Sequence, residues 1–314
     1  MRLLRVTLVL LVVLVVAGVG YSAATNPETD TLDVRARTNV PGQFGGLING
    51  VTHFDIAGPD TARTVVLVHG FSVPLYVWDS TFFALREHGY QVIRYDLYGR
   101  GLSDRPDVAY DGALFDAQLD GLLDSLHVRG PIDLIGLSFG GFVTAHYVST
   151  HAKRVRSLTL IDPIASGGPL PWFLRLPIIG PWMWQIGVVP KMADNQASDF
   201  LHPEHFPGWA DKYRPQMRFP GFGRALLRTR QTVRETDFGA LYASVGRTKV
   251  PVLLIWGKQD HTVPIANATV VTRNIPSVEF VPIDSSGHLP HMEQATLVNA
   301  RILAFLAAHP VTKP

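Results

Sequence analysis

The chain of 314 residues contains no cysteine. This absence excludes a disulfide framework, a thiolate nucleophile, a cysteine-based zinc or iron–sulfur site and a lipid-modified N-terminal cysteine. The chain also has little net charge, because 28 Lys and Arg residues against 26 Asp and Glu residues leave a formal charge of +2. No long-range field attracts nucleic acid, and we expect no nucleic-acid partner. With 46% hydrophobic residues, the chain is long enough for one large domain with a sizeable core, or for a core with an inserted subdomain.

Residues 1–24 form a distinct N-terminal segment. Arg2 and Arg5 precede an uncharged run, Val6–Gly20, and small residues follow at 22–24. This order is typical of an export signal. From Leu3 the run reaches about 18 residues, near the lower limit for a helix that spans a bilayer, so a cleaved signal peptide and a retained membrane anchor both stay open. Either interpretation predicts an exported or membrane-anchored domain outside the cytoplasm, with the membrane as a partner if the segment is retained.

Residues 25–44 are polar, contain proline and have no usable period, which is typical of a linker. From residue 45 onward, short apolar runs recur, and most are the continuous Val/Ile/Leu stretches expected of strands covered on both faces. They are Val51–Ala57, Thr64–Val68, Gln91–Tyr95, Ile132–Leu137, Val155–Ile161, Val252–Trp256 and Val278–Ile283. Several intervening segments have helical spacing, namely Phe82–His88, Leu114–Leu126, Phe139–His151 and Leu297–Leu306. This alternation predicts an α/β fold, a mostly parallel sheet with helices on both faces.

One interval interrupts the alternation. Between Asp162 and about Thr236 no clear strand is predicted, prolines are frequent, and four of the six tryptophans occur. A loop of this length without structure of its own would be unusual in a compact domain. We therefore predict an inserted helical cap at 163–236, which divides the core into segments 45–162 and 237–314.

The sequence Gly136-Leu137-Ser138-Phe139-Gly140 is the only Gly-x-Ser-x-Gly in the chain. It lies where a buried strand ends and a helix begins, the setting in which a serine occupies a strained turn with its hydroxyl exposed above the sheet edge. A side chain at Gly136 or Gly140 would collide with the neighbouring strand or helix. Ser138 is therefore the candidate nucleophile.

A serine hydroxyl needs a base to take its proton, and the base needs an acid to hold its tautomer. In proteins with such a serine turn, the three residues follow one another along the chain in the order serine, acid, histidine. Asp260 follows a predicted strand and His288 follows the last one, so both lie at the edge of the sheet where Ser138 lies. His291 is a rival base, although it is better placed inside the final helix. Asp162, directly after another strand, is a rival acid.

Attack on a carbonyl creates a negative oxygen that backbone N–H groups can stabilise. One donor is expected from Phe139, the residue after the nucleophile, and a second from Phe71, in the loop His69-Gly70-Phe71-Ser72 after the strand Thr64–Val68. We interpret His69 as a buried scaffold residue, because it lies before the glycine and not above the pocket.

Five blocks in this order together resemble the α/β-hydrolase family over about residues 45–308. They are His69-Gly70-Phe71, Tyr95 to Asp104, Gly136 to Gly141, Trp256 to Asp260, and Gly287-His288. The chain is most similar to the subgroup of monoacylglycerol lipases, carboxylesterases and hydrolases of ring-fission products. The resemblance implies that the Asp96–Asp104 stretch is a structural loop near the active-site edge. Haloalkane dehalogenases and epoxide hydrolases of this superfamily carry an aspartate where this chain has Ser138, which argues against both chemistries.

We expect a serine hydrolase that cleaves a small-molecule carboxylic ester through an acyl-enzyme on Ser138, without a metal or organic cofactor. The aromatic cap favours an apolar or lipid-derived ester. The same residues would also suit hydrolysis of a carbon–carbon bond or a thioester, and some proteins of this fold that keep such residues act as small-molecule receptors. The sequence carries no signal for an oligomeric state.

Overall fold

The computed structural model describes residues 2–310; residues 1 and 311–314, at the ends of the predicted segments 1–24 and 237–314, lie outside the described residues. The centre of the molecule is an eight-stranded sheet in the order β1-β2-β4-β3-β5-β6-β7-β8. The strands are β1 (Gln43–Leu47), β2 (Gly50–Ala57), β3 (Thr64–Val68), β4 (Gln91–Tyr95), β5 (Ile132–Leu137), β6 (Val155–Ile161), β7 (Val252–Gly257) and β8 (Glu279–Ile283). The β1–β2 and β2–β4 pairs are antiparallel and the other pairs are parallel.

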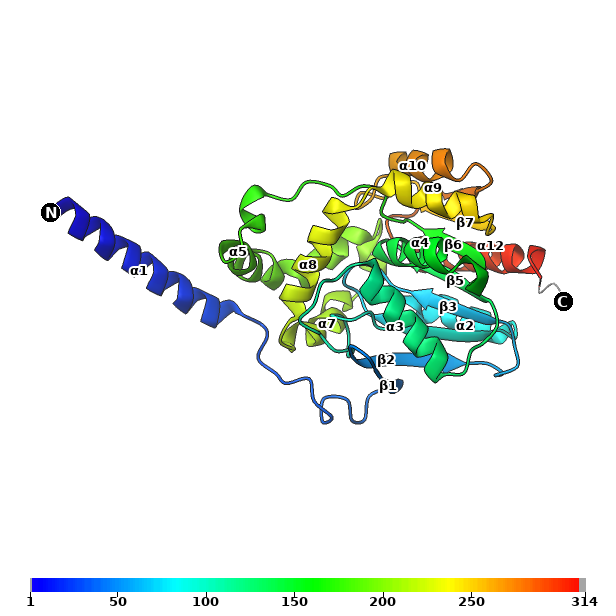
Figure 1. Cartoon of the computed structure of the whole chain (residues 1–314), viewed down its shortest axis with the longest axis horizontal. Coiled ribbons are helices and arrows are strands. Elements are labelled where there is room, and N and C mark those ends of the chain that lie inside the picture. Colours follow the sequence, from blue (N-terminus) through cyan, green and yellow to red (C-terminus); the bar gives the residue numbers. More distant parts are fainter. Residues whose placement is uncertain (1, 311–314) are drawn as a thin grey trace.

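The central strands bury both of their faces. Successive side chains of a strand point to opposite sides of the sheet, so in β3 the residues Val66 and Val68 join one apolar cluster while Val65 and Leu67 join the other. Six helices of the core cover the two faces. One cluster includes residues of α3 (Gly112–Ser125), α4 (Phe139–His151), α9 (Phe238–Thr248) and α10 (Ala268–Asn274), and the other includes residues of α2 (Asp79–Glu87) and α12 (Ala295–Ala308) (Figure 1). The predicted mostly parallel α/β architecture is confirmed.

β1 is the strand that the sequence pattern did not reveal. It starts at Gln43, inside the predicted linker 25–44, and pairs antiparallel with β2. Its sequence, QFGGL, holds two glycines and has no apolar run, and none of its side chains is buried. A strand that buries so little at the sheet edge leaves almost no hydrophobic signal.

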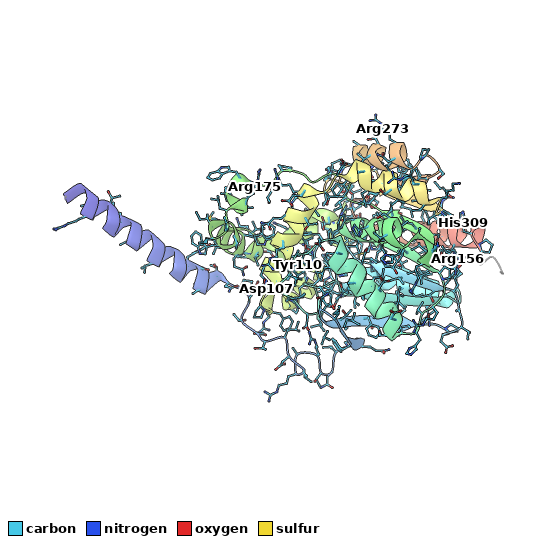
Figure 2. All side chains as sticks on the ribbon, in the orientation of Figure 1. Asp107, Tyr110, Arg156, Arg175, Arg273 and His309 are labelled. Atoms are coloured by element: carbon cyan, nitrogen blue, oxygen red, sulfur yellow. The ribbon has the colours of Figure 1, made fainter. Side chains whose placement is uncertain are left out.

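Residues 163–236 form a layer of short helices without a strand in this fully described interval (Figure 1). Its α-helices are α5 (Ile179–Gly187), α6 (Met192–Asn195), α7 (Trp209–Tyr213) and α8 (Phe222–Glu235). Its 3-10 helices are η3 (Trp172–Arg175), η4 (Val189–Lys191), η5 (Gln196–Asp199), η6 (Pro203–His205) and η7 (Arg214–Arg218). Asp107 of the β4–α3 loop forms an ion pair with Arg228 of α8 at 2.6 Å, and Figure 2 shows Asp107 beside this layer.

The remaining short helices lie in loops of the core. They are η1 (Leu75–Trp78), η2 (Ala152–Arg154), η8 (Ile265–Asn267) and α11 (Pro290–Glu293).

The N-terminal helix α1 (Arg2–Thr25) projects from the body of the molecule (Figure 1). No helix in the described part of the chain is long and apolar enough to cross a membrane.

The linker after α1 is held against the helical layer of residues 163–236, which is called the cap below. Asn26 accepts a hydrogen bond from the Gln185 amide at 2.7 Å, and the Glu28 carboxylate accepts from the N–H groups of Gly221 and Gly223 at the start of α8. An anionic group at this position is stabilised by the dipole of the helix.

Candidate active site

Ser138 lies in a sharp turn between β5 and α4. Its φ is +53° and its ψ is −114°, a conformation that costs a non-glycine residue about 1–3 kcal/mol. Two glycines make the turn possible. A Cβ at Gly136 would lie 2.4 Å from the Gly140 oxygen, and a Cβ at Gly140 would lie 2.2 Å from the Val68 oxygen. The turn is also anchored by the Ser138 N–H, which donates to the Ile161 carbonyl at 2.9 Å. The collision expected at both glycines is thus present.

Asp260 and His288 form a buried pair, as the sequence predicts for acid and base. The distance from His288 Nδ1 to Asp260 Oδ2 is 2.7 Å, and both side chains are nearly inaccessible to solvent. The other carboxylate oxygen of Asp260 accepts the N–H groups of Thr262 and Val263, each at 2.8 Å. Three donors therefore fix the Asp260 carboxylate, and its bond to Nδ1 leaves Nε2 of His288 as the basic nitrogen.

Ser138 and His288 line one cavity of about 260 Å³, together with Gly70 and Phe71. No hydrogen bond between the Ser138 hydroxyl and the His288 ring occurs among the described residues. Such contacts are often long in a free enzyme and shorten when substrate binds. The geometry brings the predicted nucleophile and base to one cavity without joining them directly.

The His288 ring is tuned by opposing effects. Burial lowers its pKa, whereas the charge of Asp260, the hydrogen bond to Asp260 and the charge of Asp199 raise it. The balance leaves the pKa of His288 above the ordinary value of a histidine. This is the direction expected for a base that must accept a proton during a reaction.

His291, the rival base, is hydrogen-bonded and packed within the core. Its Nε2 donates to the Val77 carbonyl at 3.1 Å, and its ring packs against Trp78 with centroids 4.7 Å apart. Burial lowers the pKa of His291 to about 3. The residue is a neutral part of the core packing in the first turn of α11.

Asp162, the rival acid, is fully buried beside the pair but does not take the Nδ1 bond. Its Oδ1 accepts the Gly257 N–H at 2.8 Å. Asp162, Asp260 and His288 are also the one set of residues in the described chain whose ligand atoms are close enough to hold a metal ion, all within 4.8 Å of one another. Asp260 and His288 are hydrogen-bonded to each other at 2.7 Å, which leaves no room for a metal ion between these two atoms. We therefore interpret the set as a hydrogen-bonded acid–base group.

The two predicted oxyanion donors border the serine. Phe71 and Phe139 line a cavity of about 500 Å³ together with Ser138. Phe139 is the first residue of α4, so its N–H has no acceptor within the helix. Arg100 holds the Phe71 loop in place, because its Nε donates to the Phe71 carbonyl at 2.8 Å and its Nη2 donates to the Thr229 hydroxyl of the cap at 2.9 Å. Burial lowers the pKa of Arg100 to about 10, which still leaves the guanidinium charged at neutral pH.

The loop around His69 is built as a scaffold. His69 Nδ1 donates to the Gly70 carbonyl and Nε2 accepts the Leu97 N–H, each at 2.9 Å. Burial lowers the pKa of His69 to about 4. Asp96, at the start of the stretch implied to be structural, is buried and accepts the Leu75 N–H at 2.8 Å. Neither residue has the free ring or carboxylate that a second base would need.

Asp199 of the cap is a site residue that sequence reasoning missed. Its carbonyl accepts the His288 N–H at 2.8 Å, its Oδ1 accepts the Thr262 hydroxyl at 2.6 Å, and it lines the cavity of Ser138 and His288. Burial raises the pKa of Asp199, against the opposing effects of the His288 charge and the Thr262 hydrogen bond. Nothing in its sequence context, QASDF, marks it among the many polar residues of the cap.

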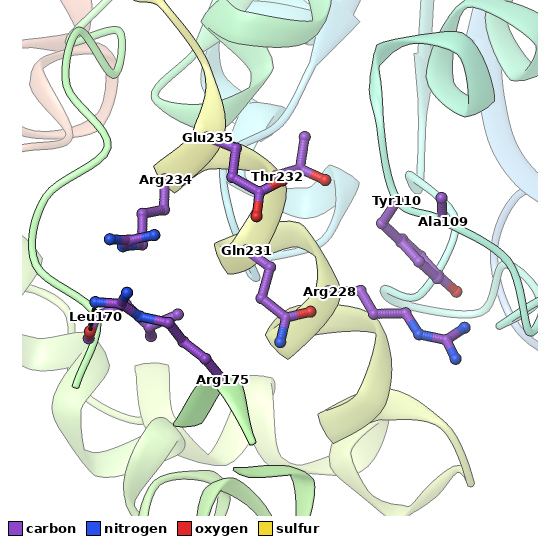
Figure 3. A pocket seen from close by; sticks show the side chains of 9 residues that line it. All are labelled: Ala109, Tyr110, Leu170, Arg175, Arg228, Gln231, Thr232, Arg234 and Glu235. Atoms are coloured by element: carbon purple, nitrogen blue, oxygen red, sulfur yellow. Dashed lines mark hydrogen bonds between the residues drawn. The ribbon is translucent and has the colours of Figure 1, made fainter. Parts of the chain in front are cut away.

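A separate cavity of about 380 Å³ lies between Tyr110 and α8, and Figure 3 shows Arg228, Gln231 and Arg234 of that helix lining it. None of the predicted site residues borders it. Its lining contains arginines and a glutamate but no serine or histidine that could form a nucleophile and base. The candidate active site is therefore the cavity at Ser138.

The fold and the serine turn define the class of α/β-type hydrolases, and comparison with known proteins agrees. The chain matches the α/β hydrolase family over residues 65–301 and belongs to that family. It is 27% identical over 283 residues to the AB hydrolase superfamily protein YfhM of Bacillus subtilis, covering 82% of this chain and 95% of that protein. It is 23% identical over 259 residues to monoacylglycerol lipase abhd6-B of Xenopus laevis, covering 75% and 73%. The enol-lactonase of Burkholderia xenovorans LB400 shares the fold, with a TM-score of 0.74 and 22% identity over 84% of this chain and 100% of that one.

The pKa of His288 predicts the acid limb of the pH profile. A base must be neutral, so kcat/KM should fall as the pH drops through the raised pKa, with a midpoint above the ordinary value of about 6.5. Asp260→Asn removes the charge that raises the pKa and should move this midpoint lower. Steady-state hydrolysis of a p-nitrophenyl ester between pH 4 and pH 9, about the range over which an ester assay reports a histidine, tests both statements. A wild-type midpoint near that of a carboxylic acid would contradict the assignment of His288.

Proposed function

We propose that this protein is a serine hydrolase that cleaves carboxylic esters through an acyl-enzyme on Ser138. The proposal rests on one observation: Ser138, in its positive-φ turn, shares a cavity with His288, whose Nδ1 is bonded to Asp260 at 2.7 Å. Membership of a hydrolase family and similarity to proteins named lipase support it. The family has members with several chemistries, so ester cleavage is our proposal for this chain.

In the first half-reaction, His288 Nε2 takes the proton of the Ser138 hydroxyl as the oxygen attacks the ester carbonyl carbon. The imidazolium that forms is stabilised by Asp260. The negative carbonyl oxygen is bound by the N–H groups of Phe71 and Phe139, each donor contributing about 3–4 kcal/mol. The carbon–oxygen bond to the alcohol then breaks, and His288 gives its proton to the leaving alcohol. In the second half-reaction His288 takes a proton from a water molecule, whose oxygen attacks the acyl carbon. The bond from that carbon to Ser138 Oγ then breaks, His288 returns the proton to Oγ, and the acid is released.

The cavity of about 500 Å³ favours an apolar acyl group. Much of its wall is aliphatic or aromatic, including Ile164, Trp184, Val188, Met192 and Val233. Its size is within the range of small-molecule sites. Among the cap tryptophans, Trp184 lines it, whereas Trp172 is 70% exposed and takes no part. We propose a lipid-derived ester such as a monoacylglycerol as the substrate.

We also propose that residues 1–24 direct export or anchor the protein, with the hydrolase domain outside the cytoplasm. Arg2 and Arg5 before the apolar run support this proposal.

Covalent labelling tests the nucleophile. A fluorophosphonate probe should modify Ser138, identified by mass spectrometry, and Ser138→Ala should lose both labelling and ester turnover. Ser103→Ala serves as a control for a serine that is buried within the structural loop. His288→Ala should slow labelling strongly because the hydroxyl loses its base. Turnover that survives in both Ser138→Ala and His288→Ala would remove these residues from the mechanism.

A substrate panel tests the reaction and its specificity. Esters of increasing acyl length should gain up to about fourfold in kcat/KM per methylene, the value of about 0.8 kcal/mol for each buried CH₂, until the cavity is full. Trp184→Ala should shift the preferred length upward. The panel includes monoacylglycerols, a thioester and a ring-fission dienone. Hydrolysis of the dienone alone would replace the ester proposal with carbon–carbon cleavage, and binding without any turnover would favour a receptor.

A fusion tests the N-terminal segment. Residues 1–44 joined to a phosphatase that is active only outside the cytoplasm should give activity, and a variant with Leu10→Arg and Val13→Arg should give none, because charges in the apolar run oppose insertion. The mass of the full-length protein recovered from the host decides between cleavage and retention. A phosphatase that is inactive in both fusions would refute export.

A further inference from the structure

Asp162 is a buried acid that the reaction described above does not use. It follows β6, its side chain is completely inaccessible, and its φ is +42°. The N–H of Asp162 donates to the Ile255 carbonyl of β7 at 3.0 Å. Asp162 thus has an unfavourable backbone conformation at the point where β6 ends beside β7.

The two acids beside His288 differ in their hydrogen bonds. The Asp260 carboxylate accepts three: from Thr262, Val263 and His288. Asp162 accepts one, from the Gly257 N–H, and its Oδ2 is buried with no hydrogen-bond partner in the described part of the chain. An ionised carboxylate in that position would leave a charged oxygen unsatisfied, which is costly.

The ligand atoms of Asp162 and Asp260 lie within 4.8 Å of each other, and two carboxylates this close do not both ionise readily. Complete burial and the charge of Asp260 raise the pKa of Asp162 well above its ordinary value, and Glu293 adds to the effect. The charged and titratable groups that act on the pair are His288 and Glu293, and Asp199 acts on His288 in turn. The excess negative charge around one imidazole favours a proton on Asp162, whose Oδ2 is buried without a hydrogen-bond partner in the described part of the chain.

We propose that Asp162 is a neutral carboxylic acid in the resting enzyme and acts as a positioning residue. Its hydroxyl donates a hydrogen bond to the Asp260 carboxylate and so holds that carboxylate toward His288. The proposal rests on the proposed function, because Asp260 and His288 have their roles only in that reaction. A protonated Oδ2 is a hydrogen-bond donor, so the buried oxygen that lacks a partner would be satisfied by its bond to Asp260. Protonation of Asp162 also leaves Asp260 as the ionised member of this pair of carboxyl groups when the imidazolium forms.

The protonation state can be measured without activity. Infrared spectra of the wild-type protein at neutral pH should contain the C=O stretch of a protonated carboxylic acid, and Asp162→Asn should remove it. Asp116→Asn, which changes another buried acid that is bonded to His146 and Thr150, should leave the band unchanged. A wild-type spectrum without such a band, or a band that persists in Asp162→Asn, would overturn the proposal.

The positioning role is tested by comparing two substitutions. Asp162→Asn keeps a donor, so its kcat and the acid limb of its pH profile should stay close to wild type. Asp162→Ala lacks the donor, so its kcat should fall by up to about 100-fold with little change in KM, the loss expected when a catalytic group is misplaced by about 1 Å. Near-ultraviolet circular dichroism shows that each variant is folded.

Two outcomes would overturn the role. If Asp162→Asn lost about 10⁴-fold in kcat and lowered the acid-limb midpoint, as expected for loss of an ionised triad acid, Asp162 would be charged and not neutral. If Asp162→Ala retained full kcat while folded, the acid would have no positioning function. Wild-type protein that lacks both ester turnover and fluorophosphonate labelling would instead refute the proposed function, while the infrared band would still report on the protonation of Asp162.

Discussion

The positive φ of Ser138 is the constraint on which the rest of the site depends. The turn joins β5 to α4, and it places Ser138 on the cavity that His288 also lines and Phe139 at the start of the helix. It requires hydrogen atoms in place of side chains at Gly136 and Gly140, since any Cβ would overlap a neighbouring carbonyl. The strain at one residue therefore places both the proposed nucleophile and one proposed oxyanion donor, and its cost is offset by the packing of β5 and α4.

The cap forms hydrogen bonds with the segments that build the candidate site. The Asp199 carbonyl orients the His288 backbone, Thr229 and Gln216 hold Arg100 and the Ser72 carbonyl, and through them the Phe71 loop is fixed. The proposed base and the loop of the proposed second oxyanion donor thus each form hydrogen bonds with both the core and the cap. Their relative position depends on how the two parts of the chain are packed together.

Much of the architecture could be predicted from the sequence, because strands buried on both faces leave continuous apolar runs. The bounds of β3, β4, β5, β6 and α4 match their predicted residues. β1 has too little buried surface to be visible in this way. In the site, the residues around Ser138, Asp260 and His288 lie at strand ends, which a topological argument can locate. Asp199 and the link from Arg100 to Phe71 depend on contacts between distant segments, which no local pattern encodes.

The attachment of the linker to the cap couples two parts of the molecule that look separate in the sequence. Asn26 and Glu28 follow directly after α1 and are bonded to α5 and α8, so little free chain remains between the projecting helix and the layer above the serine. The chain that follows α1 is therefore fixed to the cap almost as soon as the helix ends. A retained α1 would be joined through these hydrogen bonds to the layer that contains Trp184 and Asp199, two residues that line the cavities at Ser138.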